Sequence, residues 1–407
     1  MLIVQKFGGS SVANAERVQN VAKRIAETYR GGNQVIVVLS AQGDTTDELI
    51  EKAKEINPVP SKRELDMLLA TGEQQSVALM SMALHKLGCP AISLNASQIG
   101  ILSSSGYGHA RLRRIETDRL QAELDRNNII IVTGFQGVNR FGDITTLGRG
   151  GSDTSAVALA AATHAALCEI YTDVDGIYTC DPRIVKTAVK LDAISYDEML
   201  ELASLGAKIL HNRSVELAKK YNVNLVVRSS LSTAEGTLVK EEVSVESMFV
   251  SGVAVDKDVA RVSVVAIKDQ PGTAFNVFSV LSKNKISVDI ILQSIGRNNT
   301  KDITFTVAKD DLADTLRIIE ENKPRIGFDH ISSDDSIAKL SVVGAGMATN
   351  PGVAALMFEA LYEAGININM ISTSEIKISV LIDEKDANRG ANAVHDKFIG
   401  ENERLKK

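Results

Sequence analysis

Short apolar runs alternate with segments of helical periodicity up to about residue 230. Several of these runs are continuous, β-branched and bounded by turn residues, which is typical of strands covered on both faces. They occupy residues 2–4, 35–39, 91–94, 129–132, 169–172 and 225–227. Between them, one helical face carries Val18, Val21, Ala22 and Ile25, and an alanine-rich run spans residues 154–167. This alternation predicts an α/β domain with a mainly parallel sheet.

The chain beyond about residue 245 contains an internal repeat. A single fixed offset aligns identical residues in two copies: Val262 with Val342, Pro271 with Pro351, Phe278 with Phe358, Leu281 with Leu361, and Ile286 with Ile366. Each copy reads as strand, Pro-Gly turn, helix, strand, turn, strand and helix, the pattern of a ferredoxin-like βαββαβ unit. Such units leave a sheet face or edge to cover, so we expect them to pair with each other or with another chain. The alternative is that the repeat only builds a dimer interface.

Length and polarity give the domain boundaries. A chain of 407 residues is too long for one ordinary core. The polar segment 240–247 suits a linker. We therefore predict a first domain over residues 1–240 and two repeat domains over residues 250–335 and 336–407.

Composition limits the kind of protein. The formal net charge is -6, which argues against a broad nucleic-acid surface, because phosphate contacts need clustered lysine and arginine. Cys89, Cys168 and Cys180 are scattered and odd in number, which predicts reduced thiols in the cytoplasm. No apolar stretch approaches the roughly 20 residues that cross a bilayer, and no signal-like segment precedes residue 2. We therefore expect a cytoplasmic protein with no nucleic-acid or membrane partner.

The first candidate for chemistry is the segment Lys6-Phe7-Gly8-Gly9-Ser10-Ser11, between the first strand and the first helix. Two glycines let the backbone approach an oxyanion, and a helix N-terminus offers unpaired N–H groups beside the charge of Lys6. The spacing is not that of a Walker loop. A Gly-Gly turn with no ligand is the alternative.

A second Gly-Gly helix start lies at residues 148–154. Arg149 suits bidentate binding of a carboxylate, Ser152 is positioned to cap the helix, and Asp153 falls in its first turn. A well-capped helix without a ligand is the alternative. Two such starts, each with a flanking cation, favour an anionic ligand held between them.

The segment 172–183 follows a strand and contains three acids and one arginine. It suits a nucleotide or its magnesium ion; the alternative is an Asp-Gly turn with capping acids. Lys208 is a lone candidate, and such a lysine is more often solvated. The six histidines show no spacing typical of a metal site, so we predict no protein metal site.

Taken together, these segments resemble the aspartokinase family. The resemblance rests on residues 6–11, 38–47, 72–74, 148–153 and 172–183, and it extends to about residue 400. The set is specific, although no single member is. The resemblance implies an amino-acid-kinase fold, a three-layer α/β sandwich with a mainly parallel sheet, followed by two ACT domains. Gln42 and Cys180 depart from the family's usual Met and Ala, at positions that need neither charge nor phosphate contact.

The resemblance also implies roles for particular residues. Lys6, Asp153 and Lys208 would be catalytic, with Asp153 orienting the lysines. MgATP would be bound by Lys6, Gly8, Gly9, Ser10, Thr172, Asp173, Tyr178, Asp181, Arg183 and Lys208. L-Aspartate would be held by Ser40, Thr45, Glu73, Arg149, Gly150, Gly151 and Ser152, with Arg149 on a carboxylate and Glu73 on the α-ammonium group.

The implied reaction moves the γ-phosphoryl group of ATP onto the aspartate side chain. The product would be 4-phospho-L-aspartate, which starts lysine, threonine and methionine synthesis. The attacking carboxylate has a pKa of roughly 4, so it needs no general base. Catalysis must then rest on positioning and on charge neutralisation by lysines, magnesium and glycine N–H groups.

The ACT resemblance implies feedback control and assembly. Lysine and threonine, alone or together, are the expected effectors. The candidate contacts are Asp269, Gly272, Ala274, Asp289, Gln293, Asn367, Asn369 and Glu375. A homodimer through the ACT domains is expected. Met248 resembles the internal start of a separate regulatory chain in some relatives, so an α2β2 assembly is open; the alternative is an ordinary methionine.

Three other functions compete with this interpretation. The same fold phosphorylates glutamate, acetylglutamate, carbamate or nucleotides, but the tandem ACT repeat and residues 40–47 favour aspartate. A non-catalytic amino-acid sensor would not need Lys6, Asp153 and Lys208. A structural dimerisation protein leaves both Gly-Gly helix starts unexplained.

Overall fold

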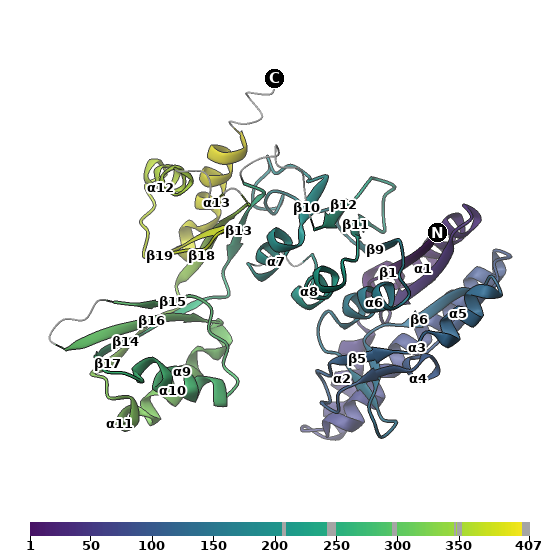
Figure 1. The fold of residues 1–407 in the computed structure, drawn as a ribbon, viewed down its shortest axis with the longest axis horizontal. Helices are drawn as coiled ribbons and strands as arrows, with labels where there is room; N and C mark the ends of the chain where they lie inside the picture. Colours follow the sequence, from purple (N-terminus) through teal and green to yellow (C-terminus); the bar gives the residue numbers. More distant parts are fainter. Residues whose placement is uncertain (206–208, 242–249, 295–298, 346, 348–351, 401–407) are drawn as a thin grey trace. The chain divides into compact units, whose positions relative to one another are not determined.

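The computed structural model describes residues 1–205, 209–241, 250–294, 299–345, 347 and 352–400. The chain divides into two compact units (Figure 1). The first comprises Met1–Tyr178, Lys190–Ser204 and Lys208–Ser247, and the second comprises Thr179–Val189, Leu205–Ala207 and Met248–Lys407.

The first unit is built on an eight-stranded sheet in the order β10-β12-β11-β9-β1-β2-β6-β3. Its pairs are parallel except for β11 with β12. The strands are β1 (Leu2–Phe7), β2 (Gln34–Leu39), β3 (Ala91–Leu94), β6 (Ile129–Thr133), β9 (Leu167–Thr172), β10 (Ala193–Ser195), β11 (Leu225–Ser229) and β12 (Thr237–Lys240). The apolar runs of the inner strands are buried, as expected for strands covered on both faces, whereas the edge strand β3 is only half-buried over residues 91–93. The predicted α/β class with a mainly parallel sheet is confirmed.

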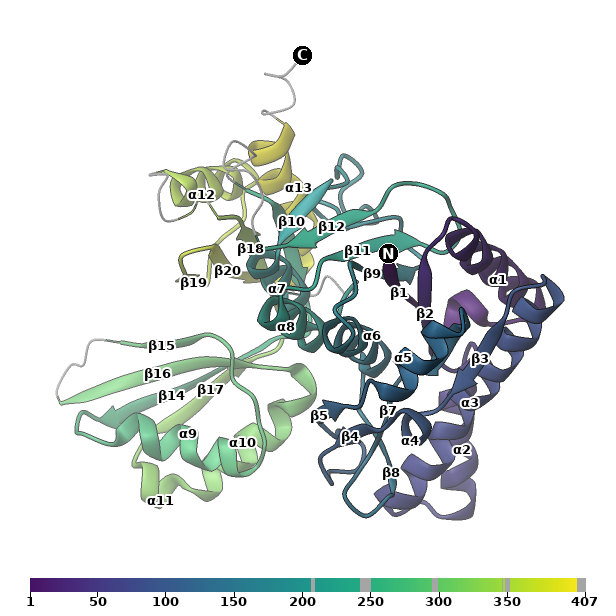
Figure 2. The ribbon, with the colours of Figure 1, turned by 45° about the vertical axis from the view of Figure 1, so that its right-hand side comes forward.

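Helices cover this sheet (Figure 2). They are α1 (Ala15–Arg30), α2 (Thr45–Ile56), α3 (Lys62–Lys86), α4 (Ala96–Ile99), α5 (Asp118–Asp125), α6 (Gly151–Ala162), α7 (Tyr196–Ser204) and α8 (Asn212–Tyr221). The predicted apolar face of α1 is buried and shares a core with α3 and with Val35 and Val37 of β2. Successive strand residues point to opposite faces, and α6 packs against β1, β2 and β9.

A second, small sheet in this unit has the order β5-β4-β7-β8. Its strands are β4 (Ile101–Ser103), β5 (Leu112–Ile115), β7 (Gln136–Val138) and β8 (Ile144–Thr146). Strand β8 packs against α3 and leads directly into the second Gly-Gly segment. These strands are too short to stand out by periodicity in the sequence.

The second unit contains two four-stranded antiparallel sheets. The first, β15-β16-β14-β17, comprises β14 (Ala260–Lys268), β15 (Ile291–Gln293), β16 (Thr300–Val307) and β17 (His330–Asp334), with helices α9 (Thr273–Lys283), α10 (Leu312–Glu321) and α11 (Lys323–Ile326). The second, β13-β18-β20-β19, comprises β13 (Gly252–Asp256), β18 (Ile337–Val343), β19 (Met370–Thr373) and β20 (Lys377–Asp383), with α12 (Val353–Glu363) and α13 (Ala387–His395).

The strand pairing departs from a sequential division of the repeats. Strand β13 lies within the range 250–335 expected for the first repeat, but it pairs with β18 of the second. The segment Thr179–Val189 belongs to the second unit, although it falls within the expected first domain. Its Cys180 and Val185 join the core of the second sheet. Both exchanges bring together segments far apart in the sequence, which local patterns do not reveal.

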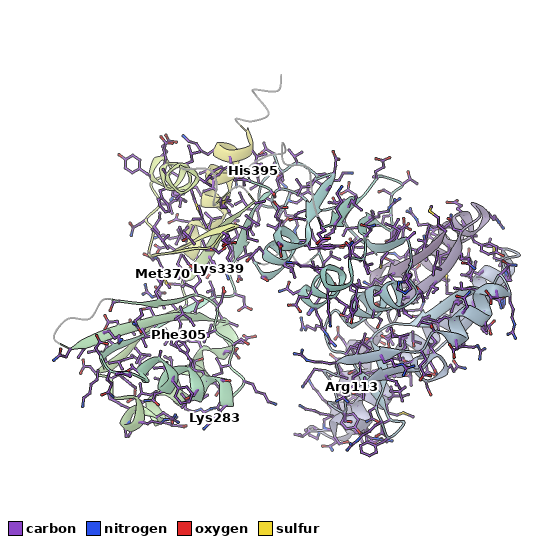
Figure 3. The ribbon with its side chains drawn as sticks, viewed as in Figure 1. Arg113, Lys283, Phe305, Lys339, Met370 and His395 are labelled. Atoms are coloured by element: carbon purple, nitrogen blue, oxygen red, sulfur yellow. The ribbon has the colours of Figure 1, made fainter. Side chains whose placement is uncertain are left out.

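The two repeat sheets meet at a small apolar cluster and a buried lysine (Figure 3). Val259, Ile290, Ile337, Met370 and Leu381 form the cluster. Lys339 Nζ lies 2.5 Å from Asp289 Oδ2 and 3.5 Å from Asp256 Oδ2. A buried ammonium group needs compensating charge, and of these two carboxylates Asp289 belongs to the first repeat, so the Lys339–Asp289 pair links the two repeats.

The described helices include none with the length and apolarity to cross a membrane. All three cysteines are free and buried.

Candidate active site

The candidate residues gather where the strands of the large sheet end. In the parallel register Phe7 lies opposite both Leu39 of β2 and Tyr171 of β9. The residues that follow these strands therefore meet at one edge, which is where ligands bind in open α/β sheets. The sequence motifs after β1, β2 and β9 supply this edge.

Lys6 and Asp153 form a buried ion pair at this edge. Lys6 Nζ lies 2.6 Å from Asp153 Oδ1, and each residue is 9% exposed. Lys6 comes from β1, and Asp153 lies in the first turn of α6 as predicted. The carboxylate compensates the lysine charge and fixes the ammonium group beside Gly8, where a Cβ would stand 3.4 Å from Nζ.

The Gly8-Gly9 turn packs directly on the turn after β2. A Cβ on Gly9 would lie 2.6 Å from the carbonyl oxygen of Ala41, so only glycine fits. The Gly43 N–H donates to the Gly9 carbonyl at 3.1 Å. A 3-10 helix over Gly9–Val12 follows, and α1 begins only at Ala15. The N–H groups nearest the glycines thus belong to the 3-10 turn and not to α1.

Ser152 does not cap α6, so that expectation is wrong. The N-cap position is Gly150, whose φ is 67°, and no side chain caps the helix. Instead Ser152 Oγ accepts a hydrogen bond from Ser40 Oγ at 2.9 Å. A Cβ on Gly134 would come within 2.6 Å of Ser152 Oγ, so this glycine makes room for the serine pair.

Glu73 is a buried carboxyl on α3. It is 2% exposed, and Oε1 accepts a hydrogen bond from the Ala41 N–H at 3.1 Å. Oε2 is buried with no well-formed hydrogen bond to a described residue. Burial raises the pKa of Glu73 to about 7, and hydrogen bonding by Ala41 and Gln136 only partly opposes the rise. Thr45, the first residue of α2, donates to the Gln42 carbonyl at 2.6 Å.

The 147–151 loop carries Arg149, which is exposed and makes no hydrogen bond or ion pair with a described residue. Gly148 and Gly150 both have left-handed backbone, with φ of 78° and 67°. Gly151 is the first residue of α6. The loop therefore presents a free guanidinium group from a backbone that only glycines adopt easily.

The expected nucleotide residues divide between the two units. Thr172 ends β9, Asp173 is exposed, and Tyr178 donates to Asp175 Oδ1 at 2.9 Å, all within the first unit. Asp181 and Arg183 belong to the second unit. There Arg183 Nη2 lies 2.7 Å from Asp181 Oδ2, and this guanidinium group holds the pKa of Asp181 below its usual value. Lys208 lies outside the described residues.

The eight expected effector contacts are all exposed in this chain: Asp269, Gly272, Ala274, Asp289, Gln293, Asn367, Asn369 and Glu375. Two of the acids already have cationic partners. Asp269 Oδ1 lies 2.6 Å from Lys301 Nζ, and Asp289 pairs with Lys339. Gln293 ends β15, which is an edge strand of its sheet.

Two further residues at the edge of the large sheet were not predicted from the sequence. Ser230, just after β11, accepts a hydrogen bond from Ser11 Oγ at 2.8 Å, and Gly134 follows β6. Their position directly after predicted strands was the available signal. Among the described residues, no group of three or more histidine, cysteine, aspartate or glutamate side chains could hold a metal ion.

Known proteins match this chain over both units. Residues 1–229 match the amino acid kinase family, and residues 262–322 and 340–398 match the ACT domain. An aspartokinase of Bacillus sp. (strain MGA3) is 50% identical over 398 residues, covering 98% of this chain and 97% of the relative. An aspartokinase of Corynebacterium glutamicum is 50% identical over 403 residues, covering 98% and 96%. The structure of E. coli aspartokinase III in complex with aspartate and ADP matches with a TM-score of 0.82 and 25% identity, covering 98% of this chain and 99% of that chain.

The raised pKa of Glu73 predicts a pH-dependent stability. The native state favours the protonated carboxyl, so wild-type stability falls as pH rises from about 4.5 to about 7 and then stays low. Glu73→Gln removes this effect. We expect the free energy of unfolding of Glu73→Gln to exceed that of the wild type by about 3 kcal/mol at about pH 8. At about pH 4.5 the two values are expected to differ little. Urea unfolding at both pH values measures this, with the exposed Glu55→Gln as control. An equal difference at both pH values would contradict the buried-carboxyl argument.

Proposed function

Because the chain belongs to the aspartokinases, within the amino acid kinase family, we propose that the edge carrying Lys6 and Asp153 is where ATP phosphorylates L-aspartate. The γ-phosphoryl group moves to the side-chain carboxylate and gives 4-phospho-L-aspartate, the first step towards lysine, threonine and methionine. The buried Lys6–Asp153 pair beside the Gly8-Gly9 turn carries this proposal.

The main obstacle to this transfer is the repulsion between two anions. The aspartate carboxylate must reach a triphosphate, so positive charge has to be in place before the reaction. Lys6 supplies such a charge, and Asp153 keeps its ammonium group fixed. The N–H groups of the glycine turn add donors that need no reorganisation. Lys208 would supply a second cation.

Aspartate binding would use Arg149 and Glu73 at its two ends. The exposed guanidinium of Arg149 suits a bidentate carboxylate contact. Glu73 suits the α-ammonium group, because a buried carboxyl with an open oxygen gains most from an arriving cation. Ser40, Ser152 and Thr45 would complete the aspartate site, together with the backbone of Gly150 and Gly151.

ATP would lie along the segment after β9. Its contacts would be Gly8, Gly9, Ser10, Thr172, Asp173, Tyr178, Asp181, Arg183 and Lys208. E. coli aspartokinase III, a relative of the same fold, is described in complex with aspartate and ADP, which supports nucleotide binding here. Magnesium bound with the phosphates, near carboxylates such as Asp173, would neutralise part of the triphosphate charge.

Lys6→Ala is the sharpest test of the catalytic assignment. We expect kcat to fall by about 10³-fold or more, because the variant loses charge at the transferring group and leaves Asp153 unpaired. Acyl phosphate trapped as the hydroxamate measures turnover, and thermal unfolding checks the fold. Lys23→Ala, at an exposed position on α1, is the matched control. A Lys6→Ala kcat within about tenfold of wild type would rule out this role.

Substrate choice is tested by offering three acids side by side with ATP. We expect hydroxamate from L-aspartate and none from L-glutamate or N-acetyl-L-glutamate. Contacts at Glu73 and Arg149 would place the shorter side chain of aspartate at the phosphoryl group, and N-acetylation removes the ammonium charge that Glu73 would bind. Omitting ATP is the control for background colour. Product from a different acid alone would overturn the aspartate assignment.

We also propose that the ACT repeats bind lysine, threonine or both at the interface of a homodimer. The edge strands β15 and β19 support this pairing, because exposed Ile291, Leu292 and Ile371 lie on strands with an unpaired side. The eight exposed contact residues lie in these two repeats. An effector ammonium group at Asp289 would have to share this carboxylate with Lys339.

Effector binding predicts both inhibition and stabilisation. Millimolar lysine or threonine is expected to lower hydroxamate formation and to raise the melting temperature, because a ligand that binds one state better shifts the population towards it. Gln293→Ala is expected to weaken both effects, whereas the exposed Asn388→Ala on α13 keeps them. No response to either amino acid in activity or melting temperature would refute this regulation.

Assembly beyond a dimer and the cellular location stay predictions. The α2β2 alternative depends on an internal start at Met248, which lies outside the described residues. A cytoplasmic location agrees with three free, buried thiols.

A further inference from the structure

Arg213 joins the start of the 147–151 loop to the backbone of Ala110. It is the second residue of α8, and its guanidinium group reaches two carbonyl oxygens. Nη1 donates to the Leu147 carbonyl and Nη2 to the Ala110 carbonyl, each at 2.9 Å. Leu147 lies two residues before Arg149, so this fork fixes the start of the loop that carries the free guanidinium group.

The start of α8 also packs tightly against the loop. A Cβ on Gly150 would lie 2.3 Å from the side chain of His211, the N-cap of α8. On the other side, a Cβ on Gly148 would stand 3.1 Å from the Gly108 carbonyl oxygen. The loop is therefore enclosed between residues 108–110 and the first turn of α8, and Arg213 joins these two walls.

Helix α3 fixes the strand that leads into the loop. Asp66 is 1% exposed and accepts hydrogen bonds from the Thr146 N–H at 2.8 Å, from the Thr146 hydroxyl at 2.7 Å and from the Gly108 N–H. The same helix places Glu73 in the site. The hydrogen bonds of Asp66 therefore link α3, which carries Glu73, to the strand that leads into the loop of Arg149. Both proposed contacts of the substrate are positioned through this link.

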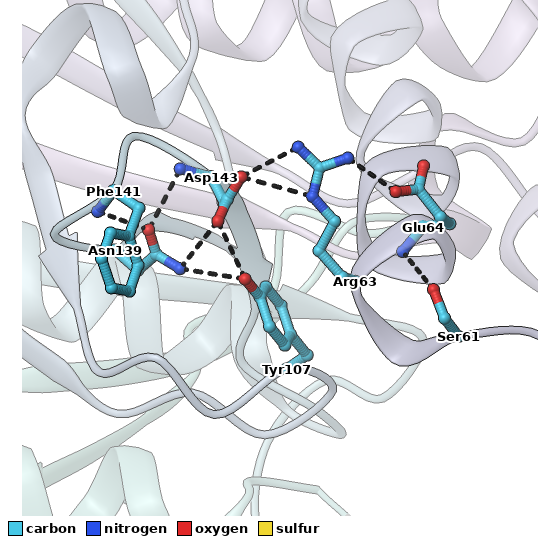
Figure 4. A network of polar contacts seen from close by, with 7 residues as sticks. All are labelled: Ser61, Arg63, Glu64, Tyr107, Asn139, Phe141 and Asp143. Carbon is cyan, nitrogen blue, oxygen red and sulfur yellow. Dashed lines mark hydrogen bonds and ion pairs between the residues drawn. The ribbon is translucent and has the colours of Figure 1, made fainter.

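A second network holds the β7–β8 hairpin to the start of α3 (Figure 4). Arg63 Nη2 lies 2.8 Å from Asp143 Oδ1, and the Tyr107 hydroxyl donates to Asp143 Oδ2 at 2.8 Å. Asn139 contacts both Tyr107 and Asp143. The hairpin is therefore anchored before the chain reaches Leu147. At Leu147 the N–H donates to the Phe135 carbonyl at 2.8 Å, and the carbonyl accepts from Arg213.

The chemistry of Arg213 fits a positioning role. Its guanidinium group donates to two neutral carbonyl oxygens, and it forms no ion pair with the residues that the structure describes. Burial and the charge of Arg111 lower its pKa, yet arginine stays protonated at neutral pH. Only a planar fork spans both carbonyls; a lysine ammonium is a single point of contact. The guanidinium group therefore fixes the positions of two backbone carbonyls, and its positive charge adds to the attraction for an anionic substrate.

We infer that Arg213 is a positioning residue for aspartate, which holds Leu147 and thereby sets Arg149 in place without touching the substrate. This inference rests on the proposed role of the 147–151 loop in binding aspartate. Loss of the fork leaves the Leu147 carbonyl without this partner, while the Leu147 N–H still donates to the Phe135 carbonyl, so the start of the loop shifts but stays attached. A displacement of about 1 Å can cost about 10²-fold in a positioned reaction. The proposed ATP contacts lie outside the 147–151 loop, so we expect the effect on aspartate binding to exceed that on ATP binding.

Steady-state kinetics of Arg213→Ala, Arg213→Lys and wild type test this inference. We expect the KM for aspartate to rise about tenfold or more in Arg213→Ala, while the KM for ATP changes less than about twofold. Arg213→Lys keeps one of the two carbonyl contacts, so its KM for aspartate is expected to lie between those of the wild type and Arg213→Ala. Arg30→Ala is the matched control, because Arg30 donates to the Leu87 carbonyl at the far edge of the sheet. It is expected to leave both KM values unchanged.

Two outcomes would overturn the inference. One is an aspartate KM within about twofold of wild type in Arg213→Ala; the other is an equal rise for aspartate and ATP, which indicates general loss of structure. If Arg213→Ala fails to fold, Arg213→Lys decides by the same comparison. Wild-type turnover tests the proposed function separately, and the Arg213 comparison uses whichever acid the wild type phosphorylates.

Discussion

The buried ion pair of Lys6 and Asp153 is the contact on which the site depends. It joins the end of a central strand to the first turn of α6, so the sheet edge and the helix start are fixed by one charge interaction. A buried charge is costly unless it is paired, so each partner needs the other. In the reaction proposed above, the same ammonium group would meet the incoming phosphate, so the pair would serve phosphoryl transfer as well as the geometry of the site.

Close backbone contacts set the remaining geometry. Gly9 on Ala41, Gly134 beside Ser152 and Gly150 against His211 each leave no space for a side chain. These contacts bring three turns and the starts of α6 and α8 into close packing near the strand ends. A site for two anions needs such rigidity, because positioning supplies much of the catalysis when no general base takes part.

Local patterns in the sequence predicted the parts of this fold that are local. The apolar runs became buried strands, the face of Val18 and Ile25 was buried, and Asp153 fell in the first turn of its helix. The sequence did not predict that β13 pairs with β18 of the second repeat, or that residues 179–189 pack in the core of that repeat. In both cases the partners lie far away in the chain. Ser152 was expected to cap α6 but pairs with Ser40, since a glycine with left-handed backbone already starts the helix. Arg213 has no sequence signature, because its partners are backbone carbonyls.

The segment after Tyr178 shows how the repeats are connected to the nucleotide residues. Thr179 is fully buried in the second unit, where its carbonyl accepts from the Val253 N–H at 2.7 Å and its hydroxyl meets His395 Nε2 at 2.9 Å. Val253 belongs to the exchanged strand β13, and His395 ends α13. The core of the second repeat is therefore one peptide bond away from Tyr178, a proposed nucleotide contact. Because packed cores are dense and do not deform continuously, Thr179 has a fixed place in this core, and the chain from Tyr178 to Val189 starts from that fixed point.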